Sequence, residues 1–182
     1  MSSEGRDIAE LVEVVEGYIP VTGGNIWYKI VGANRKKIPL LVLHGGPGTP
    51  HDYLEPLEAL SDERPVIFYD QLGCGNSDKL GDVSLWTIER FLDELEKVRT
   101  YLSLDKMHLL GQSWGTMLAV DFMLAKKPKD VVSLILSGPC LSLSRFVSDQ
   151  KAYLLELSDT LQRTINEVRR LDASAQGNIK MP

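Results

Sequence analysis

Short runs of consecutive apolar residues recur along the chain and are separated by longer segments with helical periodicity. The apolar runs cover residues 39–43, 66–69, 107–110 and 131–136. A strand that is apolar on both faces is typical of the buried interior of a parallel sheet. We therefore expect the four runs to form the parallel strands of one sheet.

Helical patterns and turn signals predict the remaining elements of the core. Apolar side chains recur every three or four positions in residues 85–102, which predicts an amphipathic helix with Ser84 as its cap. Residues 115–126 predict a second helix, and residues 16–22 and 25–31 predict a hairpin. Strands that alternate with helices indicate an α/β fold with a mostly parallel sheet and flanking helices.

The character of the chain changes after Pro139. Residues 142–171 are helical in pattern and polar, without a further strand. We divide the chain into an N-terminal extension (1–15), an α/β core (16–140) and an appended helical segment (141–182).

The composition is that of a globular domain. The chain has 182 residues, of which 43% are apolar and 25% charged, and its net charge is −5. The basic residues are scattered, so we expect neither a nucleic-acid nor a membrane partner. Cys74 and Cys140, the two cysteines, are expected to be free thiols in a reducing compartment. The sequence contains no apolar signal core and no run long enough to span a bilayer, which favours a cytoplasmic location.

The strongest chemical signal is the pentapeptide Gly111-Gln112-Ser113-Trp114-Gly115. It follows a predicted strand and precedes a predicted helix, the context in which a G-x-S-x-G motif carries the nucleophile of α/β-hydrolases. The two glycines remove side chains that would clash in the tight turn. Ser113 is therefore the predicted nucleophile, and a structural glycine-rich turn is the alternative.

A second glycine-rich segment, His44-Gly45-Gly46-Pro47-Gly48, follows the apolar run at 39–43. Its glycines allow the backbone to approach a substrate closely. We assign the oxyanion hole to the backbone N–H groups of Gly46 and Trp114. The alternative is a plain turn with a hydrogen-bonded His44. No metal-ligand cluster is apparent, and we expect neither a metal nor a cofactor.

Taken together, three motifs resemble the proline iminopeptidase family of α/β-hydrolase serine peptidases. They are His44–Gly48, Asp70-Gln-Leu-Gly-Cys-Gly-Asn-Ser77 and Gly111–Gly115, and they occur in that order. The resemblance extends over residues 16–143. One departure is Thr116, where the family usually has glycine; we expect this β-branched side chain to press on the turn.

The resemblance implies both an activity and a fold. Members of the family release an N-terminal residue, proline above all, from short peptides or amides by acyl transfer, so a small peptide or amino-acid amide is the implied substrate. It also implies that the helical segment after residue 140 is the start of a helical cap on an α/β-hydrolase core.

The sequence lacks an obvious base for the serine. In α/β-hydrolases the triad acid and histidine follow the serine in the chain. The three histidines, His44, His51 and His108, all precede Ser113. We expect a structural role in its loop for His44, an exposed or capping position for His51, and packing against a helix for His108.

These observations predict a C-terminally truncated enzyme with an incomplete sheet. Alone it would have little or no turnover, and a complementing C-terminal chain would supply the acid and the histidine. Two alternatives remain open. One is an esterase or amidase of the same fold, and the other is a non-catalytic split subunit or binding module that engages a partner through its open sheet edge.

Overall fold

The structure is a computed structural model that describes residues 11–177. It contains two compact units, residues 1–141 and 142–182, and each is described here by itself. Most of the predicted extension, residues 1–10, lies outside the described residues.

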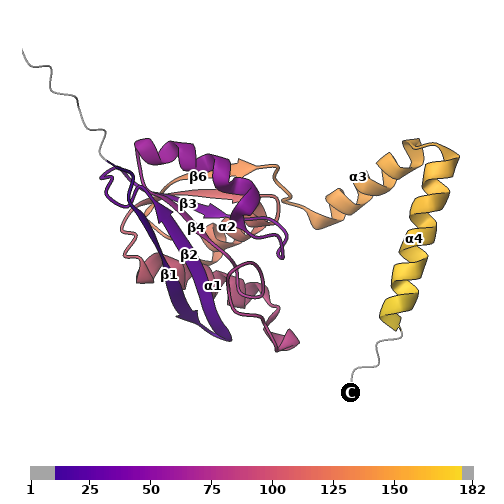
Figure 1. The fold of residues 1–182 in the computed structure, drawn as a ribbon. Coiled ribbons are helices and arrows are strands. Elements are labelled where there is room, and N and C mark those ends of the chain that lie inside the picture. Colours follow the sequence, from indigo (N-terminus) through magenta and orange to yellow (C-terminus); the bar gives the residue numbers. More distant parts are fainter. Residues whose placement is uncertain (1–10, 178–182) are drawn as a thin grey trace, which may run out of the picture. The chain divides into compact units, whose positions relative to one another are not determined.

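The first unit is built on a six-stranded sheet with the strand order β1-β2-β4-β3-β5-β6 (Figure 1). β1 and β2 form an antiparallel hairpin, β2 pairs antiparallel with β4, and the pairs β4–β3, β3–β5 and β5–β6 are parallel. The mostly parallel α/β sheet expected from the sequence is therefore confirmed. The strands are β1 Val14–Val21, β2 Gly24–Val31, β3 Leu40–Leu43, β4 Val66–Tyr69, β5 Met107–Gln112 and β6 Val131–Ser137.

The predicted hairpin is present with slightly different bounds. β1 begins at Val14, inside the segment assigned to the N-terminal extension, and its pairing with Val31 extends the ladder to that residue. The pairing of Val21 with Gly24 leaves two residues in the turn, Thr22 and Gly23, one position earlier than the predicted strand ends.

Helical elements cover both faces of the sheet. They are η1 His51–Asp62, η2 Val83–Leu85, α1 Ile88–Tyr101 and α2 Trp114–Lys126. On one face the core contains Phe91 and Leu95 of α1 and Phe122 of α2. On the other face, Leu54 and Leu57 of η1 pack against the sheet. This two-sided cover explains why β3 and β4 are buried along their whole length.

The cap predicted for the helix at residues 85–102 is wrong. Thr87 caps α1, because its side-chain oxygen accepts a hydrogen bond from the Arg90 N–H. Ser84 lies instead within η2, a separate 3₁₀ turn whose own cap is Asp82.

The far edge of the sheet is open within the described residues. β6 is the last strand of the order and pairs only with β5. Val132, Leu134 and Ile135 of this strand are exposed, although their apolar character is typical of a covered strand.

The second unit consists of two helices in its described part, residues 142–177. α3 spans Leu143–Glu156 and α4 spans Asp159–Gly177. Ser142 caps α3 by accepting the Arg145 N–H. The helical pattern read for residues 142–171 is confirmed. No helix within residues 11–177 combines the length and the apolar character needed to cross a membrane.

Candidate active site

Ser113 forms the sharp turn between β5 and α2. β5 ends at Gln112 and α2 begins at Trp114, and Ser113 between them has φ 51° and ψ −115°. A positive φ is strained for a residue with a side chain. The Ser113 N–H donates to the carbonyl oxygen of Ser137 at the end of β6, at 3.0 Å. The strand–turn–helix context predicted around Ser113 is confirmed.

The two glycines of the pentapeptide are required by backbone contacts. A Cβ on Gly111 would lie 2.3 Å from the carbonyl oxygen of Gly115. A Cβ on Gly115 would lie 2.2 Å from the carbonyl oxygen of Leu43, at the end of β3. Neither position can hold a side chain without moving the main chain. Their predicted role in the turn is therefore confirmed.

The loop at residues 44–48 lies directly against Ser113. A Cβ on Gly45 would lie 3.3 Å from the Ser113 Cβ. A shallow pocket of about 220 Å³ opens beside this contact, lined by Gly45, Gly46, Thr49, Tyr53, Gln112 and Ser113. The two glycine-rich motifs, far apart in the sequence, therefore meet at one pocket.

The amides assigned to the oxyanion hole border this site. Gly46 has φ +112°, and a Cβ there would lie 2.2 Å from the Gly48 nitrogen. Within the described part of the chain, the Gly46 N–H donates to no other group. Trp114 is the first residue of α2, so its N–H has no acceptor within the helix. Pro47 and Gly48 of the same loop do not line the pocket.

His44 is fully buried and its ring is held within the loop. Nδ1 donates to the Gly45 carbonyl oxygen at 2.8 Å, and Nε2 accepts the Gln71 N–H at 2.9 Å. Burial lowers the pKa of His44 more than the Gly45 carbonyl and the charge of Asp70 raise it. A neutral ring with both nitrogens in use is suited to holding the loop in shape.

Pro50 is the N-cap of η1 and His51 is its first residue, so the expectation of an exposed or capping position for His51 is wrong. Its ring is buried, with the centroid 4.5 Å from that of Trp27. Nδ1 donates to Asp70 Oδ1 at 2.8 Å, and the His51 N–H donates to the same oxygen at 3.0 Å. Burial acts to lower the pKa of His51, but the hydrogen bond and charge of Asp70 outweigh it and the pKa is raised.

The sequence did not reveal the polar partner of His108. Its Nδ1 is hydrogen-bonded to the Ser133 hydroxyl of the neighbouring strand β6 at 2.7 Å. Among residues 11–177, none of the three histidines is hydrogen-bonded to the Ser113 side chain.

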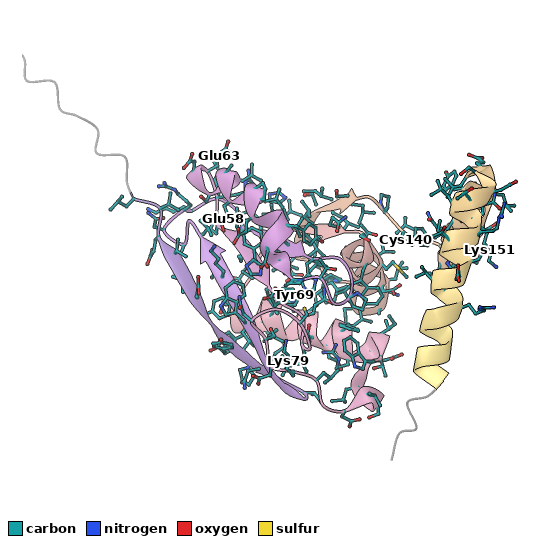
Figure 2. All side chains as sticks on the ribbon, turned by 45° about the vertical axis from the view of Figure 1, so that its right-hand side comes forward. Glu58, Glu63, Tyr69, Lys79, Cys140 and Lys151 are labelled. Carbon is teal, nitrogen blue, oxygen red and sulfur yellow. The ribbon has the colours of Figure 1, made fainter. Side chains whose placement is uncertain are left out.

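Thr116 does not strain the turn as expected but reinforces it. The side chain is fully buried, and its hydroxyl donates to the Ser113 carbonyl oxygen at 2.6 Å. The same hydroxyl accepts the Cys140 N–H at 3.1 Å. Cys140 lies where the chain leaves β6 (Figure 2). One side chain therefore joins the nucleophile turn to the exit of the last strand.

Sequence reasoning missed two further residues at the site, Tyr53 and Gln71. Tyr53 lines the pocket beside Ser113, and no sequence pattern distinguished it. Gln71 is fully buried between the 44–48 loop and Trp114. Its place in the motif that begins at Asp70 was the available signal, but the motif alone does not reveal the contacts.

Residues 11–177 hold no group of three or more histidine, cysteine, aspartate or glutamate side chains placed to bind a metal ion. Cys74 and Cys140 are free, as the sequence predicted. Burial raises the pKa of the Cys74 thiol to about 12, so this thiol stays protonated at neutral pH.

The sheet, the strained serine and the adjoining loop define the α/β-hydrolase fold, and comparison with known proteins agrees. A family model described as alpha/beta hydrolase fold matches residues 38–181, so the chain belongs to this family. The proline iminopeptidase of Heyndrickxia coagulans is 48% identical over 151 residues, which are 83% of this chain and 52% of that protein.

Solved structures agree with this family assignment. VinJ superposes with a TM-score of 0.82 at 30% identity, over 88% of this chain and 56% of that chain. A proline iminopeptidase of Mycobacterium smegmatis superposes with a TM-score of 0.76 at 31% identity, over 91% of this chain and 56% of that chain. The resemblance to proline iminopeptidases is confirmed, and the chain spans about half the length of the curated relatives it matches.

Proposed function

We propose that Ser113 is the nucleophile of a serine hydrolase of the proline iminopeptidase type. Its substrates would be short peptides or amino-acid amides with a free N-terminal residue, proline preferred. The observation that carries the proposal is the positive φ of Ser113 beside the pocket formed by Gly45 and Gly46. A strained serine between a strand and a helix is the arrangement in which a hydroxyl stands clear of the backbone.

The proposed chemistry is acyl transfer. Ser113 Oγ attacks the carbonyl carbon of the N-terminal residue, and a histidine takes the hydroxyl proton. The N–H groups of Gly46 and Trp114 stabilise the oxyanion of the tetrahedral intermediate. The histidine returns the proton to the leaving amine, and water then releases the amino acid from the serine ester.

We infer that the histidine and its acid belong to polypeptide that is not in this sequence. No histidine follows Ser113 among the 182 residues. The rings of His44, His51 and His108 are engaged with Gln71, Asp70 and Ser133. The matched regions cover only 52% and 53% of two of the relatives, which supports the inference.

We place this additional polypeptide along β6. The strand has an unpaired edge within the described sheet, and Val132, Leu134 and Ile135 leave apolar surface uncovered there. The polypeptide could be continuous with this chain or a separate complementing chain. Without it, turnover by the 182 residues would be little or none.

A cytoplasmic location stays a prediction.

The test is to complete the protein and measure its activity. The chain is fused to, or co-expressed with, the part of the Heyndrickxia coagulans relative that it does not match. We expect hydrolysis of proline p-nitroanilide and labelling of Ser113 by a fluorophosphonate. The Ser113→Ala control should lower kcat by on the order of 10⁶-fold.

The other outcomes separate the alternatives. Hydrolysis of p-nitrophenyl acetate without hydrolysis of proline p-nitroanilide would indicate an esterase of the same fold. If Ser113 is not labelled even in the completed protein, while the intact relative is labelled under the same conditions, the catalytic proposal is wrong. A binding module that uses the β6 edge would then be favoured.

A further inference from the structure

We propose that Tyr53 and Gln71 are positioning residues that fasten the 44–48 loop to the residues on either side of Ser113. Tyr53 joins the loop to Gln112, and Gln71 joins it to Trp114. This inference rests on the proposed function, because it matters for catalysis only if Ser113 is the nucleophile.

Tyr53 forms the outer connection. Its phenol oxygen accepts the Gly45 N–H at 2.7 Å and donates to Gln112 Oε1 at 2.6 Å. Both distances are those of good hydrogen bonds. The phenol also lies 3.0 Å from where a Gly45 Cβ would be, so the hydroxyl is tightly held against the loop.

Gln71 forms the inner connection. Its main-chain N–H donates to His44 Nε2 at 2.9 Å, and its side-chain Nε2 donates to the His44 carbonyl oxygen at 3.3 Å. Its Oε1 accepts the indole N–H of Trp114 at 3.0 Å. Only this orientation of the amide satisfies both partners, because the reverse would place NH₂ against the indole N–H and oxygen against the carbonyl.

The two connections have a joint consequence for the oxyanion hole. Tyr53 uses the Gly45 N–H, so the Gly46 N–H is left as the loop amide available to an oxyanion. Gln71 sets where the loop stands relative to Trp114, whose N–H is the second proposed donor. Oxyanion stabilisation requires donors that are held in place before the reaction, and the two side chains supply that rigidity.

The first test measures hydrogen exchange in the 182-residue chain by NMR. Tyr53→Phe should raise the exchange rate of the Gly45 amide about fivefold, the effect of losing one ordinary hydrogen bond. Tyr18→Phe is the matched control, because Tyr18 is likewise exposed but lies on β1. Unchanged exchange at Gly45 in Tyr53→Phe would overturn the outer connection.

The inner connection has its own spectroscopic readout. Gln71→Met should move the indole N–H resonance of Trp114 and speed its exchange, because the indole loses its acceptor. The indoles of Trp27 and Trp86 serve as internal references. If the Trp114 signal does not respond to Gln71→Met, the inner connection is wrong.

The catalytic consequence is tested in the completed protein. Tyr53→Phe should lower the rate constant for modification of Ser113 by a fluorophosphonate about tenfold, with an unchanged dissociation constant for the reagent. An unchanged rate constant would overturn the positioning role. If the wild-type completed protein does not react at all, the proposed function fails, and the exchange rates still decide whether the two connections exist.

Discussion

Replacing Asp70 by asparagine is expected to destabilise the first unit strongly. The Asp70 carboxylate lies at the end of β4 and is fully buried. Oδ1 accepts the N–H and the Nδ1–H of His51, at 3.0 and 2.8 Å, and Oδ2 accepts the Asn76 N–H at 2.8 Å. Whichever way an asparagine amide is turned, its NH₂ group faces a donor.

The magnitude follows from these contacts. Hydrogen bonds to a charged group contribute about 1.5–3 kcal/mol each. Removing one partner of a buried charge pair costs about 3–5 kcal/mol. We therefore expect Asp70→Asn to lower the free energy of unfolding by about 3–5 kcal/mol, measured by urea denaturation. Asp78→Asn is the comparison, because Asp78 is exposed and accepts the N–H and the side chain of Asn25; its cost should be about 1 kcal/mol.

The same substitution should change the pH dependence of stability. Burial alone would lower the pKa of His51, but Asp70 raises it above its ordinary value. A histidine with a raised pKa adds stability that is fully present below its unfolded pKa and is lost as the pH rises through the folded pKa. The wild type should therefore lose stability as the pH rises above about 6.5, the ordinary histidine pKa, and through the raised pKa of His51, and Asp70→Asn should lack this loss. An Asp70→Asn protein that is destabilised by less than about 1 kcal/mol, or that keeps the loss above neutral pH, would refute the reasoning.

Three further predictions concern the turn and the thiols. Gly115→Ala should lower the free energy of unfolding by about 3 kcal/mol in urea denaturation, because the new Cβ would clash with the Leu43 carbonyl oxygen. Gly48→Ala is the control: a Cβ there meets open space, so the change should be less than about 0.5 kcal/mol. Equal effects of the two substitutions would contradict the contact between Gly115 and Leu43. Thr116→Val removes both hydrogen bonds of a buried hydroxyl and should cost about 1–3 kcal/mol, while Thr116→Ser should recover most of it. Iodoacetamide at about pH 8 should modify the half-buried Cys140 and spare Cys74, whose pKa burial raises to about 12; similar rates by mass spectrometry would show that Cys74 is not shielded.

The sheet and the nucleophile turn could be predicted because their signals are local. A strand buried on both faces has to be apolar at consecutive positions, as in β3 and β4. The turn at Ser113 needs glycines at fixed offsets, so the requirement appears directly in the sequence.

The remaining features depend on partners that are distant in the sequence. The burial of His51 follows from Asp70, nineteen residues later, and nothing near His51 indicates that partner. The segment 51–62 forms a 3₁₀ helix that contains Pro56, and the sequence pattern did not give its bounds. Thr116 differs from the usual family residue, but its effect on the turn depends on Cys140, which lies beyond the end of β6.

The left-handed backbone of Ser113 also bears on the evolution of the chain. A side chain held at positive φ costs about 1–3 kcal/mol, and glycine would adopt the same conformation without that cost. In a lineage whose chain no longer performs chemistry, mutation to glycine at this position would therefore be favoured by stability alone. The residue found at position 113 in natural variants of this gene is thus a record of whether selection still acts on the hydroxyl.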